Sequence, residues 1–250
     1  MLSFFRSIRR SLLNEGKTWK YIKYAVGEFL LIVAGILVAL QIQTWNENRK
    51  LEQERRELID NLKADFQFNL ERVEESLLTA DSQMDTLKDF MSKATREDVI
   101  VSREEILAFL MAAYGQLDYR PLLGVYQAAV SDNSFKLLGS TRIRELFMEF
   151  EETNTSFQKS KDIAIENIFL HGAATIRKEV GSFCGLADGL LLPENERFAT
   201  TPEKFQNIMK DREIYANCEL IYILKRNRRN SLMLLRDINE QILAALEALD

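Results

Sequence analysis

The feature that most constrains this chain is an uninterrupted run of twelve apolar residues from Phe29 to Leu40. Twelve residues are too few to cross a bilayer as a helix, because a span needs about 20. The flanks lengthen the run to Tyr24–Trp45, and these 22 residues would rise roughly 33 Å as a helix. Tyr24 and Trp45 place aromatic side chains at its two ends, as at membrane interfaces. The run therefore predicts a single transmembrane helix over residues 24–45.

The charges on either side of this segment predict its orientation. Residues 1–24 carry six bases and one acid, whereas residues 46–250 carry 27 bases and 36 acids. Because Lys and Arg accumulate on the cytoplasmic side, we expect a single-pass protein of a bacterial inner membrane, with its N-terminus cytoplasmic and its C-terminal domain periplasmic. No A-x-A-like cleavage site follows the run, so we interpret it as an uncleaved signal-anchor. A buried helix of a soluble protein is the alternative.

The same charges bear on domains and partners. Residues 1–23 are expected to form a basic amphipathic leader at the cytoplasmic face, with a disordered basic tail as the alternative. Residues 24–45 form the span and residues 46–250 a helical bundle domain. The lipid bilayer is the first expected partner. The acidic bulk gives no electrostatic reason to expect nucleic acid.

Three residues inside the predicted span are candidates for contacts in the membrane. Glu28 lies one turn inside the first boundary, where its carboxylate either reaches back to the headgroups or makes a polar contact within a membrane assembly. Gly35 and Ala39 form a small-xxx-small pair, which allows two helices to approach closely. The pair indicates a homo-oligomer or another membrane protein as partner.

The first fifty residues resemble a known family. The residues that carry the resemblance are Phe4-Phe5-Arg6, Ile8-Arg9, Leu12-Leu13, Tyr24-Ala25-Val26-Gly27-Glu28, Gly35-Ile36-Leu37, Ala39-Leu40-Gln41 and Trp45-Asn46-Glu47. They resemble the domain of unknown function 6090 (DUF6090) family, uncharacterised membrane proteins from Bacteroidetes, and "GVYQAAVSDNSFKLLGSTRIRELFMEFEE" is a second, fainter match. The resemblance implies a membrane location, assigns no activity, and makes Glu28 part of a family pattern.

The remainder of the chain is patterned as helices. A long amphipathic helix over about 46–92, continuing from the span, is predicted by apolar residues at alternating steps of three and four: Leu51, Leu58, Leu62, Phe66, Leu70, Val73, Leu77, Ala80, Met84, Leu87 and Met91. A capping box at Ser102 and Glu105 starts a helix to about Gln116, and another runs over about 122–130.

Two further long helices complete the prediction. Thr141 is expected to cap a helix to about Val180, with a kink or interruption near residues 151–156. Thr201-Pro202-Glu203 starts the last helical stretch, which breaks near Asp211 and reaches Leu249. The fold class is therefore all-α: one transmembrane helix followed by an elongated extracytoplasmic bundle.

The chain offers no constellation typical of catalysis. Ser156-Phe157-Gln158-Lys159 matches S-x-x-K and Ser131-Asp132-Asn133 matches S-D-N, but their order is reversed from that of penicillin-recognising enzymes and K-T-G is missing. His171 is the only histidine and is interpreted as a packed polar residue. We therefore predict a protein that is not an enzyme, with no cofactor and no metal.

Two other features leave alternatives open. Cys184 and Cys218 either remain free thiols or form a disulfide, which an extracytoplasmic location permits. Lys225, Arg226, Arg228 and Arg229 are either a solvated helix surface or a basic docking patch for an acidic partner or lipid. The function favoured is a non-enzymatic assembly or interaction module at the cell envelope. A sensory or ligand-binding helical ectodomain working with a membrane partner is the alternative.

Overall fold

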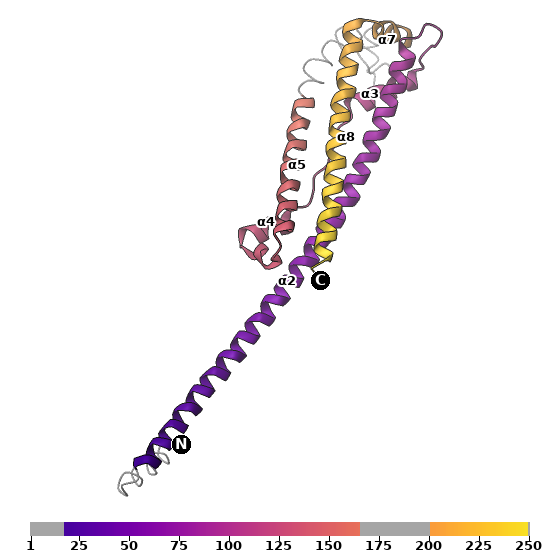
Figure 1. Ribbon diagram of the computed structural model, residues 1–250. Helices are drawn as coiled ribbons and strands as arrows, with labels where there is room; N and C mark the ends of the chain where they lie inside the picture. Colours follow the sequence, from indigo (N-terminus) through magenta and orange to yellow (C-terminus); the bar gives the residue numbers. More distant parts are fainter. Residues whose placement is uncertain (1–17, 166–200, 250) are drawn as a thin grey trace, which may run out of the picture. The chain divides into compact units, whose positions relative to one another are not determined.

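The computed structural model describes residues 18–165 and 201–249, whose regular secondary structure is all helical, with no strand (Figure 1). The helices are α2 (Thr18–Ala94), α3 (Arg103–Tyr114), α4 (Gly124–Ser131), the 3₁₀ helix η1 (Ser134–Leu138), α5 (Thr141–Ile165), α7 (Pro202–Met209) and α8 (Arg212–Glu247). The predicted all-α class is confirmed. The chain divides into two compact units, Met1–Glu57 and Leu58–Asp250.

The described part of the first unit is a single element, the N-terminal portion of α2. It continues without a break past Trp45, as predicted, because no Gly or Pro interrupts residues 36–94. Leu51 was expected on the buried face but is 47% exposed. The buried stripe of α2 instead begins at Ile59, in the second unit.

The second unit has two apolar cores. The first core packs the end of α2 (Leu87–Ala94) with α3, α7 and the start of α8. The second core packs α2 residues Ile59–Leu77 with α4, η1, α5 and the end of α8, and α5 lies along α8. Aromatic rings fill both cores: Phe90 stacks on Phe109 at 4.3 Å in the first, and Phe66 meets Phe150 edge-on at 5.2 Å in the second.

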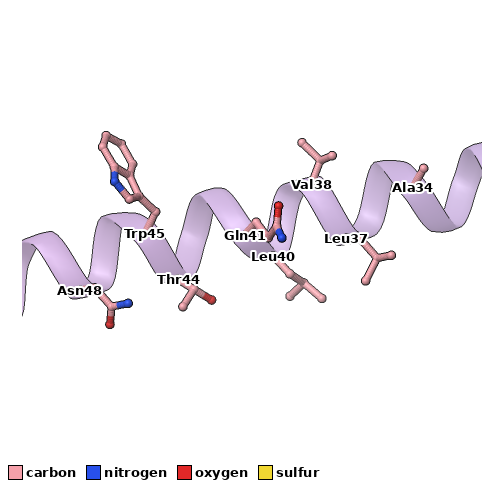
Figure 2. Close-up of a pocket in the computed structure, with 8 residues that line it drawn as sticks. All are labelled: Ala34, Leu37, Val38, Leu40, Gln41, Thr44, Trp45 and Asn48. Atoms are coloured by element: carbon pink, nitrogen blue, oxygen red, sulfur yellow. The ribbon is translucent and has the colours of Figure 1, made fainter.

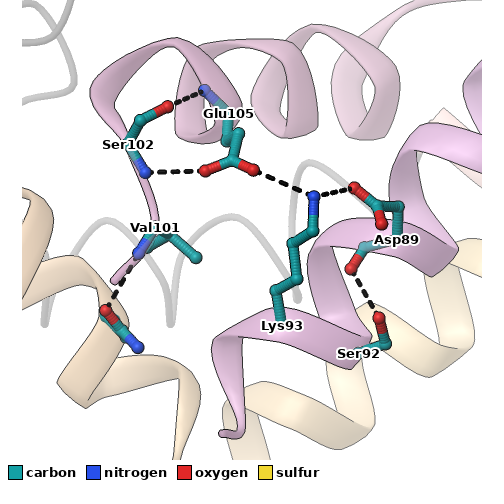
Figure 3. A network of polar contacts seen from close by, with 7 residues as sticks. Asp89, Ser92, Lys93, Val101, Ser102 and Glu105 are labelled. Atoms are coloured by element: carbon teal, nitrogen blue, oxygen red, sulfur yellow. Dashed lines mark hydrogen bonds and ion pairs between the residues drawn. The ribbon is translucent and has the colours of Figure 1, made fainter. Parts of the chain in front are cut away.

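The helix starts are set largely by the caps that the sequence predicts. Ser102 Oγ accepts from the Glu105 amide at 3.1 Å, while the Glu105 carboxylate accepts from the Ser102 amide at 2.8 Å (Figure 3). Thr201 caps α7 with Pro202 in its first turn, and Asp211 caps α8 after the expected break. These side chains satisfy amides that have no partner within the helix.

Two local predictions are wrong. The cap of α5 is Ser140 rather than Thr141, because the Ser140 hydroxyl accepts from the Ile143 amide at 3.2 Å and Thr141 is already helical. The interruption expected near residues 151–156 is also absent, since α5 is continuous from Thr141 to Ile165. Phe150 and Phe157 are both fully buried on either side of that polar stretch, so core packing outweighs its weak helix propensity. The expected end near Val180 lies outside the described residues.

Candidate functional site: an exposed apolar helix and a buried polar layer

The apolar segment 24–45 of α2 is exposed to its surroundings. None of its most apolar window is buried within the chain, and Leu31 and Phe29 are 76% and 64% exposed. Among the described residues, α2 is the one helix long and apolar enough to cross a membrane. A continuous apolar surface of this kind normally marks a membrane or protein contact, because water solvates it poorly.

Each end of this segment carries an aromatic ring paired with a cation one turn further along. The Lys23 ammonium lies 5.7 Å from the centre of the Trp19 ring, and the Arg49 guanidinium lies 5.9 Å from that of Trp45. Indole rings prefer the level of lipid headgroups, where a neighbouring cation remains hydrated. The sequence indicated Trp45 as such an anchor, but the pairing of Trp19 with Lys23 was missed.

The candidate residues within the predicted span all lie on this one helix. Glu28 is partly exposed on α2. Gly35 and Ala39 are both exposed, and a Cβ atom added at Gly35 would meet nothing within 4 Å. The face that carries the small-xxx-small pair is therefore open to a neighbouring helix.

The most polar part of the second unit surrounds an extended segment, residues 115–123, which we call the strap (Figure 1). It joins α3 to α4 and has no regular secondary structure, since Arg120-Pro121 disfavours helix. Its backbone groups are bonded instead by side chains from the long helices. Asn69 of α2 donates to the Leu122 carbonyl at 2.9 Å and accepts from the Leu122 amide at 2.6 Å, and Gln158 of α5 donates to the Tyr119 carbonyl at 2.8 Å.

Two buried cations of α8 hold the first part of the strap. Lys225 Nζ donates to the Gly115 carbonyl at 2.7 Å and to Gln83 Oε1 at 2.8 Å, and Arg228 donates to the Leu117 carbonyl. Arg228 also lies 4.4 Å from the centre of the Phe157 ring. A Cβ atom at Gly115 would lie only 2.5 Å from the Met111 carbonyl oxygen. The close approach of Gly115 to Met111 therefore requires glycine.

Burial controls the electrostatics of these groups. Lys225 and Arg228 are each only 4% exposed. Burial, and secondarily the Arg228 guanidinium, lowers the pKa of Lys225 to about 8. Burial likewise lowers the pKa of Arg228 to about 10, opposed by the carboxylates of Asp118 and Asp162. A buried cation costs free energy unless it is well bonded, and here backbone carbonyls supply much of that bonding.

The structure therefore separates the residues of the basic run. Lys225 and Arg228 point into the bundle, Arg229 pairs with Asp81 of α2, and Arg226 alone of the four is exposed. They do not make one solvent-facing patch, because residues three apart on α8 share its buried face while Arg226 lies off it. The sequence pattern identified the charge density but not the side of the helix that carries it.

Of the cysteines and the histidine discussed above, only Cys218 lies among the described residues. Cys218 is a free, fully buried thiol in the first core, and burial raises its pKa to about 12. Cys184 and His171 lie outside the described residues. Within residues 18–165 and 201–249, no cluster of three His, Cys, Asp or Glu side chains gathers to hold a metal.

Comparison with known proteins adds one finding. The profile described as "Family of unknown function (DUF6090)" matches residues 28–154, which is more than half of the 250-residue chain. The chain belongs to the DUF6090 family. No curated protein and no solved structure matches it.

The range of the DUF6090 match includes some of the features described above and leaves out others. It begins at Glu28 and includes the rest of the apolar segment, the strap, α4, η1 and the first half of α5. Residues 1–27, α7 and α8 lie outside the matched range. The strap of this DUF6090 protein thus lies within the matched range, whereas Lys225 and Arg228, which bond its carbonyls, do not.

Proposed function

We propose that this protein is anchored in a bacterial inner membrane by residues 24–45, an uncleaved signal-anchor, with its N-terminus cytoplasmic and its helical bundle periplasmic. The main support for the proposal is the apolar helix, which is not buried within the chain and has an indole–cation pair near each end. The basic leader on one side and the acidic bulk on the other support the orientation.

We further propose that the anchored bundle is a non-enzymatic assembly or interaction module of the cell envelope, without a cofactor. The polar side chains at the centre of the described bundle support this role. Lys225, Arg228 and Asn69 are used to bond the strap, so they serve the architecture of the domain. A catalytic site would instead gather titratable groups around a concave space. The expected partners are the lipid bilayer and either a second copy or another membrane protein.

A sensory or ligand-binding role is the second candidate, favoured by one groove. It has a volume of about 370 Å³ and lies beside the first core, between α2 and α8. It is lined by Lys88, Met91, Ser92, Tyr215, Glu219, Tyr222 and Ile223. Apolar walls with a few polar groups are typical of small-molecule sites. Changes in the amide exchange of α8 on adding periplasmic extract of small molecules would favour this role.

The anchoring proposal is tested by extraction and by reporters. After alkaline carbonate treatment, the chain should remain with the membranes. A reporter active only in the periplasm, fused after Asp250, should be active, and a cytoplasm-active reporter at the same place should be silent. Release by carbonate would contradict the anchor, and activity of the cytoplasmic fusion alone would contradict the orientation.

The assembly role has a separate test in Glu28. If the carboxylate makes a polar contact in a membrane assembly, Glu28→Ala should reduce the amount of cross-linked oligomer and Glu28→Gln should retain more of it. If Glu28 only reaches the headgroups, both variants should behave as the wild type. Membrane levels measured in parallel separate loss of assembly from loss of insertion.

A further inference from the structure

The exposed segment of α2 carries a heptad pattern that the small-xxx-small pair does not explain. Ala34, Gln41 and Asn48 follow one another at intervals of seven, and so do Leu37, Thr44 and Leu51. The two series alternate by three and four, which is the spacing of positions a and d in a coiled coil, although only Ala34, Leu37 and Leu51 of these residues are apolar. We call these six residues the heptad seam, and Figure 2 labels five of them.

The seam is unoccupied within the described part of the chain. Its residues are all exposed, and Leu37 and Leu51 are 58% and 47% exposed. A shallow hollow on this side of the helix is lined by Ala34, Leu37, Gln41, Thr44 and Asn48, together with Val38, Leu40 and Trp45 (Figure 2). The polar side chains of the seam are the amides of Gln41 and Asn48 and the hydroxyl of Thr44. Gln43, which is not part of the seam, donates to Glu47 at 2.9 Å.

We propose that the seam binds a second copy of this chain, forming a parallel, two-fold symmetric helix pair. The proposal rests on the membrane anchoring proposed above. Copies of a single-span protein insert with the same orientation, so their spans can pair only in parallel. In a parallel, in-register pair each a or d residue faces its own copy. Gln41 then faces Gln41, and Asn48 faces Asn48.

The chemistry of the seam suits its own copy better than lipid or a generic apolar helix. An amide carries both a donor and an acceptor, so two identical amides on a two-fold axis complete each other's hydrogen bonds. Near or inside a bilayer such bonds replace those that water would supply. Small Ala34 allows close approach further into the apolar run, and an Asn at an a position fixes the register of a two-helix pair.

The seam and the small-xxx-small pair make different predictions. Successive residues of a helix are about 100° apart, which places Gly35 and Ala39 about 150–170° around α2 from the middle of the seam. One helix pair cannot bury both faces at once. The contact through Gly35 and Ala39 is therefore the direct competitor of the contact through Gln41 and Asn48.

Oxidative cross-linking of the full chain in membranes tests the proposal. Single cysteines are introduced by Ala34→Cys, Gln41→Cys and Asn48→Cys, with Gly35→Cys and Ala39→Cys as matched controls. Each cysteine is introduced into a chain that also carries Cys184→Ser and Cys218→Ala. The same five substitutions are repeated with Cys184 and Cys218 in place, in case the chain without its own cysteines does not accumulate. We expect a disulfide-linked dimer from the cysteines at residues 34, 41 and 48. We expect no dimer band from the cysteines at residues 35 and 39.

Each other result overturns the seam. Dimer only at residues 35 and 39 would assign the contact to the small residues. No dimer at any of the five positions would indicate lipid or a different protein as the occupant. Carbonate extraction of the same membranes separates the two proposals: chain retained without heptad-spaced cross-links defeats the seam alone, whereas chain released defeats the anchoring as well.

Discussion

At the scale of single residues, two amides that lie in apolar surroundings hold the connections between helices. Asn69 takes a place in the buried stripe of α2 and bonds both backbone groups of Leu122. Gln206 of α7 donates to the Val99 carbonyl at 2.6 Å and accepts from the Val101 amide at 3.3 Å. Both connections lack regular structure, so these side chains supply the bonds that a helix or sheet would have supplied.

Replacing Asn69 should therefore lower the free energy of unfolding more than replacing an exposed residue does. In Asn69→Leu the amide and carbonyl of Leu122 lose their partners, and we expect the free energy of unfolding to fall by about 1–3 kcal/mol. Asn61→Leu makes the same change on the exposed side of α2 and should stay within about 0.5 kcal/mol of the wild type. Urea unfolding of the full chain in mild detergent, followed by circular dichroism, measures both. Equal effects would contradict the role of Asn69.

The buried Lys225 should leave a signature in the pH dependence of stability. Its pKa is about 8 in the folded chain against 10.5 when unfolded, so unfolding takes up a proton between these values. The unfolded state then binds more protons, and the free energy of unfolding should rise from about pH 8. Above about pH 9 the raised pKa of the Cys218 thiol acts in the opposite sense, because unfolding then releases a proton.

The pH window for this measurement is therefore pH 8 to 9. Lys225→Met should abolish the rise in that window, although it also lowers stability overall by leaving the Gly115 carbonyl and Gln83 without their donor. Thermal or urea unfolding at several pH values gives the slope for both chains. An unchanged slope in Lys225→Met would show that Lys225 is not the group that titrates.

At the scale of elements, local sequence signals located most helix ends and missed the contacts between distant segments. The capping box at Ser102 and the cap at Thr201 were predicted, because each acts within three residues of itself. Ser140 and Thr141 are neighbours with similar capping ability, and the one-residue error there reflects that equivalence. The bonds of the strap join residues 39 to 111 positions apart, such as Lys225 with Gly115, and no periodic pattern reports them.

At the start of α3, the contribution of the capping box to stability can be measured separately from that of the neighbouring ion pair. Lys93 bonds Asp89 at 2.7 Å and Glu105 at 3.0 Å, next to the capping box (Figure 3). We expect Ser102→Ala to lower the free energy of unfolding by about 1 kcal/mol, since it removes the acceptor of a helix-end amide. Lys93→Met should have a smaller effect, because exposed ion pairs are screened by water.

Glu105→Gln completes that comparison. Gln preserves the capping box, so this variant should resemble Lys93→Met rather than Ser102→Ala. Urea unfolding of the three variants under one condition provides the ranking. A loss in Lys93→Met as large as that in Ser102→Ala would assign the stability of this helix start to the ion pair instead.

At the scale of the whole bundle, the second unit consists of two cores with a polar layer between them. Along α8, the first core ends at Ile221 and the second begins at Leu232, and Lys225 and Arg228 lie in the interval. Along α2, Gln83 lies in the interval between Leu77 and Leu87. A polar layer couples two apolar cores less strongly than continuous packing would, so each core can open as its own cooperative unit.

Hydrogen exchange of the full chain, resolved by peptides, should reveal these units. Phe109→Ala removes the ring that stacks on Phe90 in the first core, a change that costs about 3–5 kcal/mol in a well-packed interior. We expect faster exchange in α3, α7 and the first turns of α8, with little change in α5 and in α8 beyond Leu232. Phe150→Ala in the second core is the matched variant and should speed exchange in α5 and in that last part of α8. If either variant accelerated exchange evenly through both cores, the polar layer would not divide the bundle, and the unit would unfold as one.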